Sequence, residues 1–88
     1  MPDLTKTEQY ILDRRLEKRP FKAIAQDLGL AIGTISVHHA RAQEKLGAES
    51  FRGALRAWKA WRVTNAEWYV PPDPTVIKDL RRTASSST

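Results

Sequence analysis

The chain has 88 residues, enough for one domain, and 41% of them are hydrophobic, so that domain can bury a modest core. Its 15 Lys and Arg residues outnumber its 10 Asp and Glu residues, and the net charge of +5 favours a polyanionic partner: DNA, RNA or an anionic membrane. The absence of cysteine excludes a disulfide framework, a cysteine nucleophile and a thiolate zinc site.

The first helix is expected to begin after Thr5. Thr5 and Glu8 have the S/T-x-x-E spacing of a capping box, which satisfies free backbone amides at a helix start. Leu12 and Leu16 then share one face of the helix. Basic residues dominate positions 14–19, and we expect the helix to end there because positive charge is favourable near a helix C-terminus.

A second helix is predicted after Pro20, because apolar residues there recur at i, i+3, i+4 and i+7. This stripe contains Phe21, Ile24, Ala25 and Leu28. Gly29 stands where the helix would need a left-handed C-cap. Two short amphipathic helices joined by a tight glycine-containing turn are typical of a helix-turn-helix. In that motif the second helix of the pair lies in the major groove of DNA.

The third helix is expected over about residues 32–46, and Gly47 closes it. Its inner stripe contains Ile35, His39, Ala42 and Leu46. The opposite face has no acidic residue before Glu44, so it does not repel phosphates. A plain all-α bundle would show similar stripes, and spacing alone does not separate such a bundle from a DNA-binding domain.

A fourth helix is expected after Ser50, which can serve as its N-cap. Its apolar stripe contains Phe51, Ala54, Leu55, Trp58 and Trp61. The chain changes character after Val63, since prolines at positions 71, 72 and 74 exclude a helix interior. We therefore expect a helical domain over residues 1–63 and an extension over residues 64–88. The extension would contain one short helix at 75–82 and a disordered Ser/Thr-rich tail.

Four linked motifs occur in a fixed order along the chain. They are Leu4-Thr5-x-x-Glu8, Ile24-Ala25-x-x-Leu28-Gly29-Leu30, Gly33-Thr34-Ile35-x-Val37-His38 and Lys45-Leu46-Gly47-Ala48. In these motifs the segment from Leu4 to Val63 resembles the LuxR-type helix-turn-helix. That domain binds DNA in quorum-sensing regulators and in many response regulators. The resemblance implies an all-α, four-helix domain whose third helix reads the major groove and whose fourth helix serves dimerisation.

The resemblance also implies which residues form the site. Base-reading positions of the family fall on Ser36, Val37 and Ala40. Phosphate contacts fall on Thr34, Arg41 and Lys45 of the third helix and on Lys22 of the second. A dimer interface on the fourth helix would use Leu55, Trp58 and Trp61. Because the motif begins at residue 4, we expect a small stand-alone member without an upstream sensory domain.

The chain departs from the family pattern at several positions. Pro20 and Ala31 stand where the second and third helices usually have a capping oxygen, and each missing cap costs on the order of 1 kcal/mol. His39 occupies a position that is normally apolar. Ser36 and Ala40 are shorter than the basic residues that many members use there, so we expect few direct hydrogen bonds to bases.

The adjacent residues His38 and His39 could form a pH switch or a metal pair. Neighbouring side chains on a helix point about 100° apart, so the two rings do not easily chelate one ion. Structural roles are the favoured interpretation, with His39 packed in the core. We therefore expect no metal and no other cofactor.

The main prediction is a transcription regulator that binds a two-fold-related site on double-stranded DNA as a homodimer. The alternative is an interaction protein that binds a LuxR-type regulator or RNA polymerase through its C-terminal half. We do not expect an enzyme, because the sequence has no clustered acid–base pair, no nucleophile with a base and no phosphate-binding loop. Without an apolar signal region or an apolar run of roughly 20 residues, the chain is expected in the cytoplasm and not in a membrane.

Overall fold

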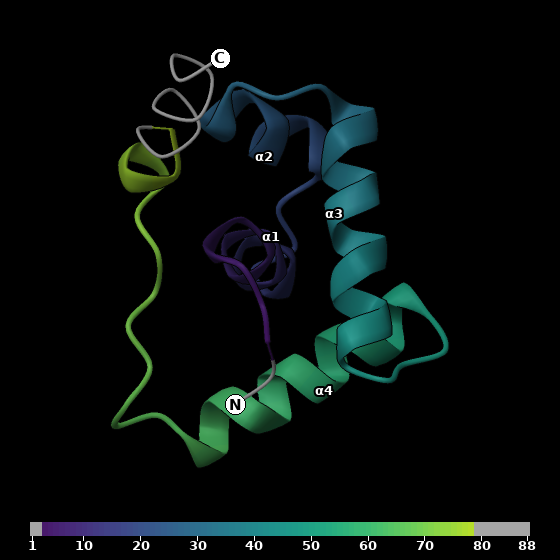
Figure 1. The fold of residues 1–88 in the computed structure, drawn as a ribbon, viewed down its shortest axis with the longest axis vertical. Helices are drawn as coiled ribbons and strands as arrows, with labels where there is room; N and C mark the ends of the chain where they lie inside the picture. Colours follow the sequence, from purple (N-terminus) through teal and green to yellow (C-terminus); the bar gives the residue numbers. More distant parts are fainter. Residues whose placement is uncertain (1–2, 79–88) are drawn as a thin grey trace.

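The computed structural model describes residues 3–78, and its secondary structure in that range consists of helices joined by turns and loops, with no strand among those residues. The main helices are α1 (Lys6–Leu16), α2 (Phe21–Leu28), α3 (Ile32–Lys45) and α4 (Phe51–Thr64). A short helical turn follows at residues 74–78. Figure 1 shows α1 end-on at the centre, with the other helices and the chain after α4 arranged around it. The predicted all-α class is confirmed.

The start of α1 has the predicted capping box. Thr5 Oγ1 accepts from the Glu8 amide at 3.1 Å, and Glu8 Oε1 accepts from the Thr5 amide at 2.8 Å. The helix ends at Leu16, within the basic run at 14–19 where its end was predicted. Lys18 takes the left-handed conformation, with φ 64°, that closes the C-terminal end of the helix, and the Arg19 amide then donates to the Arg14 carbonyl at 3.0 Å.

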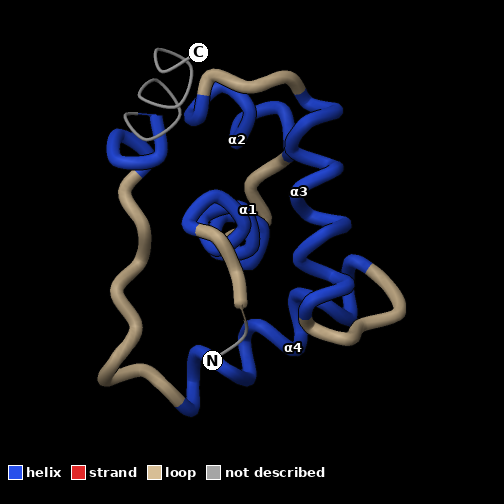
Figure 2. Tube along the Cα trace, in the orientation of Figure 1, coloured by secondary structure: helices blue, strands red, loops and turns tan. Residues whose placement is uncertain are grey.

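The turn between α2 and α3 depends on Gly29, which caps α2 with φ 65° in the left-handed region. The Leu30 amide then donates to the Ala25 carbonyl at 2.9 Å, so the chain reverses within a few residues (Figure 2). Gly47 has φ 68° after α3. Both glycines therefore act as the sequence predicted.

The apolar residues form two buried clusters. The upper cluster joins α1, α2, α3 and the C-terminal turn, and it consists of Tyr10, Ile11, Ile24, Ala25, Leu28, Ile35 and Ile77. The lower cluster joins α1, α3 and α4, and it consists of Leu4, Leu12, Ala42 and Trp58. Each fully buried large side chain contributes about 1.5–3 kcal/mol. Together the clusters fix α3 against α1 while its opposite face stays in solvent.

His39 is packed in the core, as predicted, and it is fully buried. Its ring centroid lies 4.3 Å from that of Phe51 and 5.5 Å from that of Phe21. Within residues 3–78, neither ring nitrogen has a side-chain or backbone partner at hydrogen-bond geometry. Burial lowers the pKa of His39, so the ring is held neutral.

The chain after α4 folds back along the domain. Tyr69 packs edge-on against Trp58, with ring centroids 5.3 Å apart, and Ile77 completes the upper cluster. Residues 69–73 are not helical, as the prolines predicted, and the helical turn begins at residue 74, one residue before the predicted start. The rest of the predicted helix and the Ser/Thr-rich tail lie outside the described residues. No helix in the described part of the chain is long and apolar enough to cross a membrane.

Candidate nucleic-acid interface

One face of α3 is open to solvent along the first three turns of the helix. Thr34, Val37, Ala40 and Arg41 are all exposed on it, and Val37 keeps 49% of its surface accessible. Ser36 is half-buried at the edge of this face. The structure therefore places four of the predicted contact residues together in solvent and a fifth beside them.

The opposite face of α3 is anchored to the rest of the domain. Ile35, His39 and Ala42 have no exposed surface, because they pack against the helices behind. Their spacing of i, i+4 and i+7 gives α3 one buried stripe and leaves the other side free. This is the arrangement that a helix needs to enter a groove of DNA as a rigid element.

The N-terminal ends of α2 and α3 have backbone amides with no side-chain cap. Pro20 precedes α2 and Ala31 precedes α3, and neither provides a capping oxygen. Lys22 is exposed in the first turn of α2. Uncapped amides and the positive end of the helix dipole favour an anion such as a phosphate. The missing caps predicted from the sequence are confirmed.

The two cations on α3 differ in what surrounds them. Arg41 is exposed, and over residues 3–78 no carboxylate lies within ion-pair distance of it. Lys45 Nζ lies 2.7 Å from Glu8 Oε1, a carboxylate on α1 that is 1% exposed. Burial raises the pKa of Glu8, but the Lys45 ammonium and the Thr5 amide outweigh that effect and lower it overall. Lys45 therefore holds α3 to α1, and its phosphate contact stays a prediction.

His38 lies beside this face and is half-buried. Burial lowers the pKa of His38, and the positive charge of Arg41 lowers it further. A neutral His38 leaves Arg41 as the main charge at the centre of the face. Within the described residues, no group of histidine and carboxylate side chains could hold a metal ion.

The geometry agrees with the comparison to protein families. A family model described as bacterial regulatory proteins, luxR family, matches residues 2–57. The chain belongs to the luxR family. The family consists of DNA-binding transcription regulators and is not a known enzyme family. No match was found among curated proteins or among solved structures.

One residue of the predicted luxR-type dimer interface is corrected by the structure. Trp58 is 0% exposed, because it faces inward against α1 and is covered by Trp61 and Tyr69. It therefore has no surface to offer a second subunit. Leu55 and Trp61 pack against the same lower cluster but stay half-buried, so their role in dimerisation stays a prediction.

Sequence reasoning missed a buried acid that links three parts of this luxR-family domain. Asp13 on α1 is 2% exposed and accepts from Trp58 Nε1 at 2.8 Å, from Arg62 Nη1 at 3.2 Å and from the Tyr69 hydroxyl. Burial and this hydrogen bond raise the pKa of Tyr69. The one available signal was an aspartate between the apolar positions of α1, a signal that does not reveal its partners on α4 and beyond.

Proposed function

We propose that this luxR-family domain regulates transcription by reading duplex DNA as a homodimer, with α3 in the major groove. The observation that carries the proposal is the exposed face of α3, which has no acidic residue before Glu44, together with the uncapped N-terminal ends of α2 and α3. Base edges would meet Ser36, Val37 and Ala40. Phosphates would meet Lys22, Thr34 and Arg41. Lys45 would add its charge at the far end of α3.

The side chains at the base-reading positions are short. A valine or alanine can contact a thymine methyl group, and a serine can hydrogen-bond to several bases. None of them provides the bidentate contact, worth about 1–3 kcal/mol, that arginine makes to guanine. Part of the discrimination would then come from DNA shape and deformability, which favours an AT-leaning site.

The homodimer has the support of an open hollow of about 490 Å³ along the edge of α4. Its α4 residues are mostly small, among them Gly53, Ala57 and Ala60. Small side chains let a second helix approach closely. An Ala57→Arg variant would fill the hollow, and we expect it to lower the solution mass to that of a monomer in sedimentation experiments while helicity is kept.

The test of DNA binding uses a matched pair of surface variants. Val37→Glu places a carboxylate against the groove, so it should abolish binding to duplex DNA selected from random sequence. Val70→Glu makes the same change at a side chain that is 75% exposed on the extension, and it should leave binding unchanged. Arg41→Ala should lower affinity for all sequences and flatten the log–log salt dependence by about 0.9. If Val37→Glu binds DNA as wild type does, the proposal is wrong.

A second candidate function is interaction with another regulator or RNA polymerase through the C-terminal half. It has a specific observation in its favour: the large apolar side chains exposed from residue 63 onward, which are Val63, Trp68, Val70 and Val76. Exposed apolar groups that gather in one region often mark a protein interface. A measurement of regulatory activity in cells distinguishes the two functions. If Val37→Glu loses DNA binding but keeps full regulatory activity, the chain works through a partner.

A further inference from the structure

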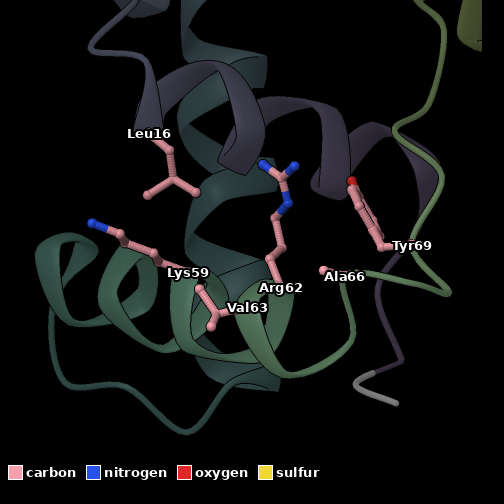
Figure 3. Close-up of a pocket in the computed structure, with 6 residues that line it drawn as sticks. All are labelled: Leu16, Lys59, Arg62, Val63, Ala66 and Tyr69. Atoms are coloured by element: carbon pink, nitrogen blue, oxygen red, sulfur yellow. The ribbon is translucent and has the colours of Figure 1, made fainter.

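A groove of about 390 Å³ lies on the side of the domain formed by the end of α1, the last turns of α4 and the chain that follows (Figure 3). Its lining residues are Leu16, Lys59, Arg62, Val63, Ala66 and Tyr69. None of them belongs to α2 or α3. The groove is therefore built from different elements than the face proposed to read DNA.

Three of the six lining residues are apolar, Leu16, Val63 and Ala66, and we call this apolar part of the lining the floor of the groove. Val63 is 71% exposed, and Leu16 and Ala66 lie near it with part of their surface in solvent. A large aliphatic side chain this exposed gains free energy when it is covered, at about 25 cal/mol for each Å² removed from water. Duplex DNA offers little apolar surface for such a contact. The floor therefore favours a protein segment as the occupant.

The rim of the groove is positively charged. The four charged residues of α4 are all basic, and of these Lys59 and Arg62 line the groove. Lys59 is exposed, and across the described chain no carboxylate lies within ion-pair distance of it. Basic residues also dominate positions 14–19 around Leu16, where Arg14 pairs with Glu17 at 3.2 Å.

Few acidic groups lie near the groove, and the carboxylate of Asp13 already accepts hydrogen bonds within the domain. Asp13 lies beneath the wall and is surrounded by donors from Trp58, Arg62 and Tyr69. Glu67 is exposed on the turn after α4, next to Ala66. Even with these groups, the cations predominate. The homodimer proposed above would use a different, small-residue edge of α4, and at this basic rim an acidic segment is the electrostatically complementary occupant.

The walls of the groove are held in place before any partner arrives. The Tyr69 hydroxyl donates to Asp13, and the Tyr69 ring packs edge-on against Trp61 with centroids 5.8 Å apart. The Arg62 guanidinium lies 4.9 Å from the centroid of the Tyr69 ring. Binding to a preformed surface avoids part of the entropy that ordering would cost.

We propose that this groove binds an acidic segment of a partner protein. An aliphatic side chain of the segment would pack on Leu16 and Val63, and a neighbouring carboxylate would pair with Lys59. The site goes beyond DNA recognition and does not depend on it, because α3 takes no part in it. A partner could therefore bind while α3 stays in contact with DNA.

The probe is a short fluorescein-labelled peptide rich in glutamate, with leucines one helical turn apart, measured by fluorescence anisotropy. Two matched peptides replace the leucines by alanine or the glutamates by lysine. We expect the acidic leucine peptide to bind at least about tenfold more tightly than either. Only this peptide has both leucines for the apolar floor and carboxylates for the basic rim. Similar binding of all three peptides would overturn the proposal.

Variants of the full chain locate the binding site. Val63→Glu should weaken binding of the acidic leucine peptide about tenfold, since it places a like charge on the apolar floor. Lys59→Glu should weaken it about threefold, a typical size for an exposed ion pair, and should improve binding of the lysine peptide. Arg52→Glu makes the same charge change on α4 outside the groove and should have less than about a twofold effect. Unchanged binding by Val63→Glu would place the peptide elsewhere.

The groove and the DNA-binding face are tested by variants whose effects differ. Val63→Glu should keep DNA binding, and Val37→Glu should keep peptide binding. If unlabelled duplex DNA instead displaces the peptide, and Lys59→Glu loses affinity for DNA, then the basic rim is a DNA contact and the inference is wrong. If Val37→Glu binds DNA normally and the peptide results are as expected, the peptide-binding proposal is supported and the DNA-binding proposal is wrong.

Discussion

The pair α1 and α4 differs from the pair α2 and α3 in how its polar groups are satisfied. Thr5 caps α1 and Ser50 caps α4, and Asp13 joins the two helices through a buried network. By contrast, α2 and α3 begin at Pro20 and Ala31 with no capping side chain. The core of α3 also holds an unsatisfied polar side chain, because neither ring nitrogen of His39 has a hydrogen-bond partner within residues 3–78. The α2–α3 pair still has polar links to α1, since Asp27 on α2 accepts from the Tyr10 hydroxyl at 3.0 Å and Lys45 on α3 lies 2.7 Å from Glu8. The two pairs therefore differ in the capping of their helix ends.

One small domain thus meets two requirements. Where helix ends only have to be stable, side chains satisfy the amides. Where helix ends would meet phosphates, the amides are left for the ligand, and the folded state gives up about 1 kcal/mol at each end. Departures from local stability rules are expected at functional sites, and the α2–α3 pair is where they occur here.

The largest expected effect comes from breaking the α1–α4 network. Trp58→Ala should lower the free energy of unfolding by about 3–5 kcal/mol, because it removes a fully buried side chain and leaves Asp13 with one donor fewer. The measurement is urea unfolding followed by circular dichroism. Trp68→Ala is the matched control, since Trp68 is 79% exposed, and its effect should stay within about 0.5 kcal/mol. Equal losses in both variants would contradict the assignment of stability to this network.

Removing the buried imidazole of His39 should have the next largest effect. His39→Leu should raise the free energy of unfolding by about 1–3 kcal/mol at neutral pH, because no buried nitrogen is then left without a partner. Leucine also suits a position between two aromatic rings. A loss of stability would mean that His39 has a partner that the geometry of residues 3–78 does not show.

The same variant tests the pH dependence. Burial lowers the pKa of His39 below its ordinary value of 6.5, so the unfolded chain takes up a proton before the folded one. Stability of the wild type should therefore be full above about pH 6.5 and fall as the pH decreases below that value. His39→Leu should show a shallower fall between pH 7 and 5. The His38 imidazole, whose pKa burial also lowers, should account for part of the slope that remains.

A side-chain cap added to α3 should change both stability and DNA affinity. Ala31→Ser should stabilise the domain by about 1 kcal/mol, because its hydroxyl can accept from the first amides of α3. The same hydroxyl would compete with a phosphate, so affinity for DNA should fall. Ser50→Ala is the mirror experiment on α4: it should cost about 1 kcal/mol and leave DNA affinity unchanged. If Ala31→Ser binds DNA more tightly, the amides of α3 are not a phosphate site.

The smallest effect is expected at Gly33, in the first turn of α3. A Cβ atom there meets nothing within 4 Å, and the backbone is helical, so Gly33→Ala should stabilise the domain by about 0.5–1 kcal/mol. If DNA approaches this backbone closely, the added methyl group should also weaken binding. Thermal unfolding and DNA titration of the same sample measure both effects, and a gain in each would remove Gly33 from the interface.

Much of the fold could be predicted from the sequence, because local rules determine it. The apolar stripes, the capping box at Thr5 and the left-handed glycines at 29 and 47 gave helices close to those observed. The exposed face of α3 followed from the same periodicity, since three buried residues on one side leave Val37 and Arg41 on the other. The end of α1 falls within the predicted basic run, but the left-handed conformation of Lys18 could not be predicted, because lysine carries no turn signal.

The rest could not be predicted because it depends on contacts between distant parts of the chain. A stripe on α4 shows that Trp58 is covered, but not whether α1 or a second subunit covers it. Asp13 has its partners 45 to 56 residues away, and Lys45 reaches Glu8 across 37 residues. Long-range polar pairs leave no periodic signal. These long-range pairs determine which face of α4 packs inside the domain and which face is exposed to a partner. The predicted dimer interface on α4 was therefore the part of the site that the sequence could predict least well.

The position of Ile77 has a consequence for the kinetics of folding. Helices α1 to α4 lie close together along the chain and can assemble through short loops, whereas Ile77 must return from beyond α4 to reach Tyr10 and Ile11. Closing so long a loop costs entropy before the contact rewards it, so we expect Ile77 to dock after the transition state. Interactions formed that late hardly change the rate of folding but slow unfolding. A single isoleucine in the extension would then set how long each folded molecule lasts, while the helix-turn-helix sets how fast it forms.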